Sequence, residues 1–131
     1  MSEGATKPLG RRQARRQALF LLYQWDLTGQ PLASLFEGEP DEFATRLAAA
    51  VAAEAPVLDE RITTASDAWT ADRLGTLERN ILRIGVYELE EETVPPEVAI
   101  NEAILLAKRY ASEDAASLVN GILGRILGEQ T

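Results

Sequence analysis

Apolar residues recur every three to four positions along most of the chain, which is the spacing of one face of an α-helix. The first such stretch runs from about Leu9 to Thr28. Its apolar stripe consists of Ala14, Ala18, Leu21, Leu22 and Trp25. Gly29 and Pro31 follow, and both residue types end helices. The pattern therefore predicts an amphipathic helix near the start of the chain.

The same spacing continues to the end of the chain, with helix-starting residues between the stretches. Pro40, Pro56 and Pro95 mark helix starts, and Ser112 is typical of a helix N-cap. The alternation of apolar and polar positions that indicates a strand is absent. We therefore expect an all-α fold of six or seven helices, the seventh being a short one over residues 32–36. The other six are expected over about 9–28, 40–51, 56–69, 76–89, 95–107 and 112–127.

Polar residues and one glycine interrupt the later helical stretches. Glu88, Asn101 and Asn120 are expected to be buried hydrogen-bond anchors. Gly121 lies inside a helix at a cost of up to about 1 kcal/mol relative to alanine, which predicts a close helix crossing. The acidic run 90–92 opposes the dipole at the end of its helix, so it is expected to fray or to meet a cationic group.

The first helix carries four arginines on a different side from the line of Ala14, Leu21 and Trp25. At about 100° per residue, Arg11, Arg12, Arg15 and Arg16 span roughly 140° of its circumference. Like charges this close repel each other, and an anionic partner would remove that cost. Two interpretations stay open: binding of RNA or DNA, and a charged face that is solvated or paired with acidic residues elsewhere in the chain.

Apolar residues continue the arginine side in the second half of the same helix. Leu19, Tyr23 and Leu27 lie there. This half of the helix is therefore either buried on all sides or in contact with a partner protein.

The composition limits the chemistry that the chain can perform. Its 131 residues include no cysteine and no histidine. This excludes disulfides, thiolate and imidazole metal sites, and catalysis by Cys-His pairs or Ser-His-Asp triads. Carboxylate-only Mg²⁺ sites remain open.

The net charge of −8 is unevenly distributed along the chain. Residues 1–16 hold five basic residues and one acidic residue, a net charge of +4, whereas the remainder carries −12. A basic patch on so acidic a chain must act at short range.

Length and hydropathy predict one domain over residues 10–131 and no membrane segment. Residues 1–9 are polar, include Gly4 and Pro8, and are expected to form a flexible arm that carries Lys7. No apolar run approaches the roughly 20 residues of a membrane span, and the run 18–22 is too short for a signal peptide. We therefore expect a soluble, cytoplasmic protein.

Five stretches resemble, in order, the NusB transcription antitermination factor family. They are the arginine-rich opening with ALFLLYQWDL (18–27), Trp69 with DRL (72–74), ILRIGVYEL (81–89), VAINEA (98–103), and ED (113–114) with LVNGIL (118–123). The ordered set spans about residues 11–127, which is most of the chain.

The resemblance implies a compact all-α fold of two packed helical bundles and a protein without catalytic activity; no cofactor or metal is expected. It implies as partner the small-subunit ribosomal protein that is called NusE in this role. Together the two would bind the single-stranded boxA element of nascent RNA and help RNA polymerase pass terminators, notably in ribosomal RNA operons. Family members are monomers or homodimers, and both stay open here.

Site residues follow from the resemblance position by position. RNA contacts are implied for the basic opening, for the aromatic residue Tyr110 and for Asp114 near it. Trp69 is implied either to stack on a base or to belong to the core. Contacts with the protein partner are implied for Tyr23, Leu27 and Glu78.

This chain departs from the family pattern in the late helices. Glu97, Ser117 and Gly124 leave less positive charge there than the family has, which shifts the expected RNA affinity toward residues 7–16. Two other functions stay open. One is a helical adaptor that binds an acidic protein through the N-terminal arginines. The other is an enzyme that uses carboxylates such as Glu88. No phosphate-binding loop or metal-binding motif in the sequence supports it.

Overall fold

The computed structural model describes residues 10–36, 38–66 and 71–130, and these residues form α-helices and 3₁₀-helices but no strand. The α-helices are α1 (Arg11–Thr28), α2 (Glu42–Ala65), α3 (Thr76–Glu91), α4 (Pro96–Tyr110) and α5 (Glu113–Gln130). The 3₁₀-helices are η1 (Leu32–Leu35) and η2 (Ala71–Arg73). None of the helices in this part of the chain is long and apolar enough to cross a membrane.

The predicted all-α class is confirmed, but the predicted number of six or seven helices is too high. The described residues form five α-helices, because α2 unites two predicted helices and the segment after α1 is only a 3₁₀-helix. Lys7 and Trp69 lie outside the described residues, so their predicted roles stay predictions.

The expected break at Pro56 is wrong, because α2 continues through it. A proline inside a helix lacks one hydrogen bond and costs about 3 kcal/mol. The buried stripe of α2 nevertheless keeps its phase on both sides of the proline. It comprises Ala44, Leu47, Ala48, Val51, Ala55, Leu58, Ile62 and Ala65. Complete burial of Leu58 and Ile62 contributes about 1.5–3 kcal/mol each, which offsets the proline, whose own ring is exposed.

Local signals set the end of α1 and the starts of α2 and α5 within about two residues of their predicted positions. Gly29 follows α1 with φ of 74°, a left-handed conformation that glycine adopts without strain. The Asp41 side chain accepts a hydrogen bond from the backbone amide of Ala44 at the start of α2. The Ser112 hydroxyl accepts one from the amide of Ala115 at the start of α5, at 3.0 Å. Each contact satisfies a helix-terminal group that has no partner within its own helix.

The polar residues that interrupt the later helical stretches differ in their burial. Glu88 is buried, as expected, and the acidic run meets a cation, because Arg61 of α2 lies 2.6 Å from Glu90. The expectation that Asn101 and Asn120 are buried is wrong: both face solvent. Periodicity identified their helices but not which side of each helix faces outward.

The predicted close crossing at Gly121 is also wrong. Gly121 is exposed, and a Cβ there would meet no atom within 4 Å. The close approach occurs instead at Gly85 of α3, where a Cβ would lie 2.7 Å from Cδ1 of Leu123 on α5. Gly85 therefore lets α5 pack directly against the central helix.

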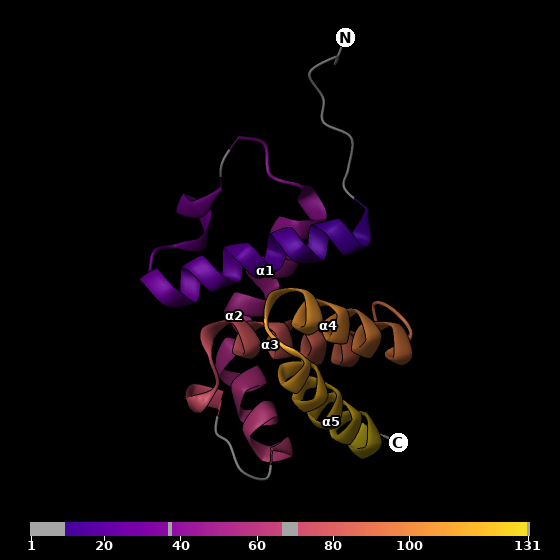
Figure 1. The fold of residues 1–131 in the computed structure, drawn as a ribbon. Coiled ribbons are helices and arrows are strands. Elements are labelled where there is room, and N and C mark those ends of the chain that lie inside the picture. The colour runs from indigo at the N-terminus through magenta and orange to yellow at the C-terminus, as the bar shows by residue number, and fades with distance from the viewer. Residues whose placement is uncertain (1–9, 37, 67–70, 131) are drawn as a thin grey trace.

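Helix α3 lies at the centre of the arrangement and contacts the other four α-helices. Helices α1, α2 and α3 contact one another, and so do α3, α4 and α5, which gives two groups of three that share α3. Figure 1 shows α1 across one end of the molecule, with the turn between α4 and α5 next to it. One cluster of buried apolar side chains draws on all five helices.

Candidate nucleic-acid interface

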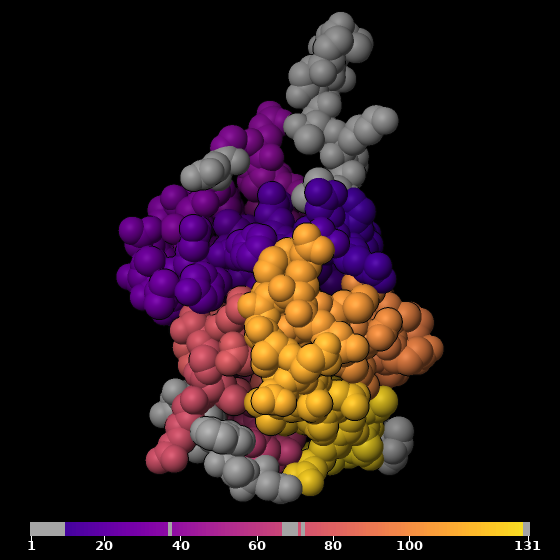
Figure 2. Space-filling view, viewed as in Figure 1, coloured from indigo at the N-terminus to yellow at the C-terminus, as the bar shows by residue number. Residues whose placement is uncertain are grey.

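Side chains of α1 and α4 meet at two points, and the two helices run in the same direction between them. Arg12 contacts Glu102 at one point and Phe20 contacts Tyr110 at the other. The two contacts are eight residues apart on each helix, or about 12 Å at 1.5 Å per residue. Figure 2 shows the same arrangement on the surface, where the segment around the end of α4 lies against α1.

A groove of about 430 Å³ lies between these two helices. Its lining residues are Arg12, Arg16, Glu102, Leu105, Leu106, Lys108 and Arg109. Four of them are cations and one is an acid, so the groove carries a net charge of +3 on a chain whose net charge is −8. We call these seven residues the α1–α4 groove. It concentrates positive charge beside apolar side chains.

Arg12 and Glu102 close one end of the groove with a two-pronged ion pair. Arg12 Nη2 donates to Oε2 at 2.8 Å, and Nε donates to Oε1 at 3.1 Å. The hydrogen bond from Arg12 is the main reason that the pKa of Glu102 is lowered, and it outweighs the opposing effect of burial. The same hydrogen bond raises the pKa of Arg12. Arg12 stays mostly exposed, with 61% of its side chain accessible.

Arg15 lies in the interior rather than on the arginine face. Only 4% of its side chain is exposed, and its guanidinium donates to Glu88 of α3 from Nε at 2.9 Å and from Nη2 at 2.9 Å. Glu102 lies 3.9 Å from its Nη1. This arginine thus balances buried carboxylates and has no surface to offer to a phosphate in this conformation.

The other residues that the sequence predicts at this interface lie at the surface. Arg11 is exposed and places its guanidinium 4.0 Å from the centre of the Phe43 ring, whereas Arg16 is half-buried and lines the groove. Tyr110 is half-buried at the end of α4. Asp114 is exposed in the first turn of α5.

Sequence reasoning missed the second wall of the groove. Lys108 and Arg109 are exposed in the last turn of α4, where cations also suit the helix dipole. The basic pair directly before Tyr110 was the available signal. Phe20 was missed as well, although 46% of it is exposed beside the groove.

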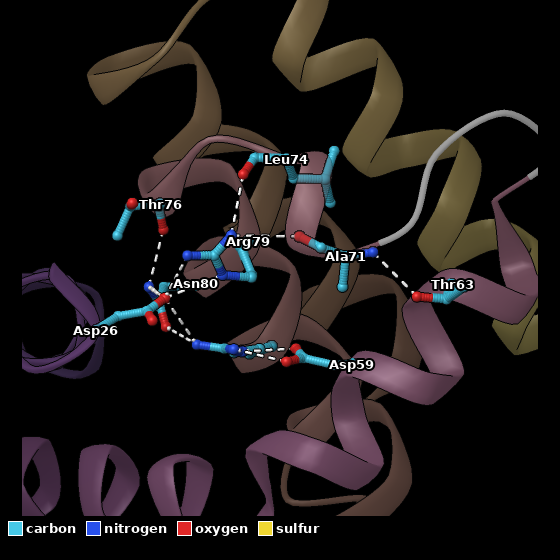
Figure 3. A network of polar contacts seen from close by, with 9 residues as sticks. Asp26, Asp59, Thr63, Ala71, Leu74, Thr76, Arg79 and Asn80 are labelled. Atoms are coloured by element: carbon cyan, nitrogen blue, oxygen red, sulfur yellow. Dashed lines mark hydrogen bonds and ion pairs between the residues drawn. The ribbon is translucent and has the colours of Figure 1, made fainter. Parts of the chain in front are cut away.

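A second polar cluster joins the C-terminal half of α1 to α2 and α3 (Figure 3). One oxygen of Asp26 accepts hydrogen bonds from Arg79 at 3.0 Å, Asn80 at 3.0 Å and Arg83 at 3.0 Å. Arg83 continues to Asp59 of α2 with two bonds of 2.7 Å. The cluster fixes the end of α1 against the start of α3.

The charge of Asp26 is favoured by this cluster. Burial alone would raise its pKa, but the hydrogen bond from Arg79 and the charge of Arg83 outweigh burial, so the pKa of Asp26 is lowered. The ionised carboxylate is therefore the form that the folded state stabilises.

The predicted partner-binding residues flank this second cluster. Leu27 directly follows Asp26 and is 60% exposed, and Glu78 directly precedes Arg79 and is half-buried. Tyr23 is half-buried one turn earlier on α1. The Asp26–Arg79 ion pair, at 2.9 Å, thus brings together the two helix segments that carry these residues.

Within residues 10–36, 38–66 and 71–130, no group of three or more acidic side chains is placed to hold a metal ion. The fold and the groove define an all-helical protein that presents a cationic surface between two parallel helices.

Comparison with known proteins identifies the family. The model of the NusB family matches residues 12–128. The transcription antitermination protein NusB of Rubrobacter xylanophilus is 42% identical over 122 residues, covering 88% of each protein. The chain belongs to the NusB family, as the sequence predicted.

Solved structures support the same assignment. NusB of T. maritima superposes with a TM-score of 0.82 at 32% identity, covering 94% of each chain. A crystal structure of antitermination factors NusB and NusE in complex with double-stranded RNA has a chain that superposes with a TM-score of 0.80 at 32% identity. That match covers 91% of this chain and 96% of the other. That complex contains NusE and RNA together with NusB, and its RNA is double-stranded, whereas the resemblance implies single-stranded boxA RNA.

Proposed function

We propose that this chain is a transcription antitermination factor without catalytic activity, which holds RNA at the α1–α4 groove. The observation that carries the proposal is the net charge of +3 in a groove on a chain of net charge −8. Phosphate is the ligand that such a surface favours.

The groove residues have separate tasks in this proposal. Arg16, Lys108 and Arg109 neutralise phosphates, and Arg12 contributes its outer edge while Glu102 holds it in place. Phosphate contacts fix the position of the strand, whereas recognition of sequence requires contacts with bases. Unpaired bases are accessible for such contacts, which supports single-stranded RNA as the ligand. We give Arg15 a structural role because it is buried against Glu88.

Protein binding takes place at the other end of α1 in this proposal. Tyr23, Leu27 and Glu78 would contact NusE, with the Asp26 cluster holding their two helices together. NusE, a basic ribosomal protein, would add positive charge to a body that repels RNA at long range. The pair would bind boxA RNA, notably that of ribosomal RNA operons, and would act with RNA polymerase in the cytoplasm.

Three further parts of the proposal come from the sequence alone. Residues 10–131 act as one domain, and residues 1–9 with Lys7 form an arm that adds to the RNA contact. Trp69 and Asp114 belong to the RNA-binding surface. The protein works as a monomer or a homodimer, which sedimentation with and without RNA distinguishes.

The experiment is a titration of labelled single-stranded RNA with the protein at several salt concentrations. Each phosphate contact contributes about −0.7 to the slope of log affinity against log salt. Arg16→Ala and Lys108→Ala are each expected to weaken binding of boxA and of unrelated RNA alike, and to make the slope shallower by up to about 0.7. Arg46→Ala on α2 removes the same charge from a side chain that is 79% exposed, so it is the matched control.

The outcome separates this function from the adaptor alternative. An affinity that does not depend on salt, or equal losses in Arg16→Ala and Arg46→Ala, would contradict RNA binding at the groove. An acidic protein that binds through the same arginines would compete with RNA in the same titration. Adding NusE is expected to tighten RNA binding relative to either protein alone.

A further inference from the structure

Phe20 occupies an unusual place for a large apolar side chain. It is 46% exposed in the middle of α1, although the helix buries Leu19 and Leu21 on either side of it. Its ring meets that of Tyr110 with centroids 5.0 Å apart and planes at 78°, an edge-to-face pair. Half of this aromatic surface therefore remains in contact with water.

The aromatic pair lies directly at the end of the α1–α4 groove. Phe20 follows Arg16 by four residues, so the two side chains share a face of α1 about one turn, or about 6 Å, apart. Arg109 places its guanidinium 5.5 Å from the centre of the Tyr110 ring and donates from Nε to its hydroxyl at 3.1 Å. The cations and the rings thus form one continuous surface.

Apolar side chains extend this surface into the groove. Leu105, 36% exposed, and the buried Leu106 line it between the cations of both walls. A surface for phosphate alone would need only cations. Cations beside exposed rings are what a nucleotide of a single strand requires, because its phosphate is charged and its base has an apolar face.

We propose that Phe20 and Tyr110 form a base-stacking subsite of the groove, which selects unpaired RNA over duplex RNA. One unpaired base stacks on the exposed part of the Phe20 ring, while Arg16 and Arg109 hold the adjoining phosphates. Bases within a duplex are stacked on their neighbours and cannot occupy this position. The inference rests on the proposed function, since it specifies the form of RNA that the groove accepts.

The test compares three probes: a short single-stranded RNA, the same strand with one abasic position, and the corresponding duplex. Phe20→Ala is expected to weaken binding of the intact single strand by about 5- to 150-fold, the range for loss of one stacked base. The salt slope stays unchanged because no charge is removed. Duplex affinity also stays unchanged, and the variant no longer distinguishes intact from abasic RNA.

Two further variants guard against a purely structural effect. Phe20→Trp keeps a stacking surface and is expected to retain the wild-type preference for the intact strand. Val57→Ala shortens another exposed apolar side chain, 58% accessible on α2, and is expected to leave all three affinities unchanged. Thermal unfolding of each variant shows whether it is folded.

The result distinguishes the stacking subsite from the proposed function. If Phe20→Ala binds all three probes as the wild type does while Arg16→Ala weakens them, the subsite is wrong and the RNA-binding groove stands. If wild-type binding is independent of salt, the proposed function itself fails. An equal loss of single-strand and duplex binding in Phe20→Ala would likewise overturn the selection of unpaired RNA.

Discussion

Arg15 shows how much the fate of one residue depends on distant parts of the chain. Its neighbours Arg11, Arg12 and Arg16 reach the surface, whereas Arg15 is 3% exposed and bonded to Glu88 of α3. Removal of two charges from water is costly, and their attraction repays that cost only when both partners are present and well oriented. The pair therefore specifies how α1 is placed on α3 more than it adds to net stability.

This view predicts an asymmetry between single and double substitutions. Glu88→Leu leaves a buried arginine without its main partner and is expected to lower the free energy of unfolding by about 3–5 kcal/mol. Arg15→Met combined with Glu88→Leu replaces the whole pair and is expected to recover most of that loss. Urea unfolding of the three proteins measures the difference. A double variant no more stable than Glu88→Leu would mean that the pair itself contributes the stability.

The burial of Glu88 was predictable from the sequence, but its partner was not. Glu88 lies at the edge of an apolar stripe of its helix, so the sequence predicts that its carboxylate needs a hydrogen-bonding or charged partner. The identity of that partner does not follow from this position, because Arg15 lies 73 residues away in the sequence. Likewise, Arg12 finds Glu102 across 90 residues. A single sequence contains no direct trace of such long-range pairs.

At the scale of helices, the apolar periodicity predicted that a helix is present better than it predicted where that helix begins and ends or which of its sides faces solvent. The apolar stripes of α1, α3, α4 and α5 were sufficient to predict these helices. The prediction for α2 was wrong because Pro56 was taken as the start of a new helix. Of the residues that line the groove, Arg12 and Arg16 of α1 were predicted from the sequence, but the basic pair Lys108 and Arg109 of α4 was not. Which helix lies beside α1 depends on the three-dimensional packing.

The close crossing of α3 and α5 predicts that Gly85 cannot be replaced by alanine without loss of stability. Gly85→Ala is expected to lower the free energy of unfolding by about 1 kcal/mol, because overpacking a core costs about 1–3 kcal/mol and the gain in helix propensity is about 1 kcal/mol. The added methyl group would press on Leu123, which is fully buried. Denaturant midpoints measure the effect.

Gly121→Ala on α5 is the matched comparison. The position is exposed and has open space around it, so alanine adds helix propensity without a clash and is expected to raise stability by up to about 1 kcal/mol. Opposite signs for the two substitutions are the expected result. Equal effects would mean that Gly85 is not the site of the close crossing.

At the scale of the whole molecule, the ion pairs link stability to pH. The pKa values of Asp26 and Glu102 are lowered in the folded protein, whereas both groups titrate near pH 4 when unfolded. The unfolded state thus binds more protons as the pH falls. Their contribution to stability is complete above about pH 4 and is lost as the pH falls through the lower folded values.

Urea unfolding between about pH 7 and pH 2 tests this dependence. The wild type is expected to lose stability over the acid range, and Asp26→Asn is expected to lose less over the same range, because it lacks one of the two groups. The comparison concerns the change with pH, so a lower stability of the variant at neutral pH does not affect it. Parallel profiles would contradict a role for Asp26.

The parallel alignment of α1 and α4 also constrains how the sequence can diverge. Arg12 faces Glu102 and Phe20 faces Tyr110 only because both intervals contain the same number of residues. Insertion of one residue into either interval would turn everything beyond it by about 100° around the helix axis. In homologues that keep this groove, the two helical segments can therefore lengthen or shorten only by steps that restore the matched phase.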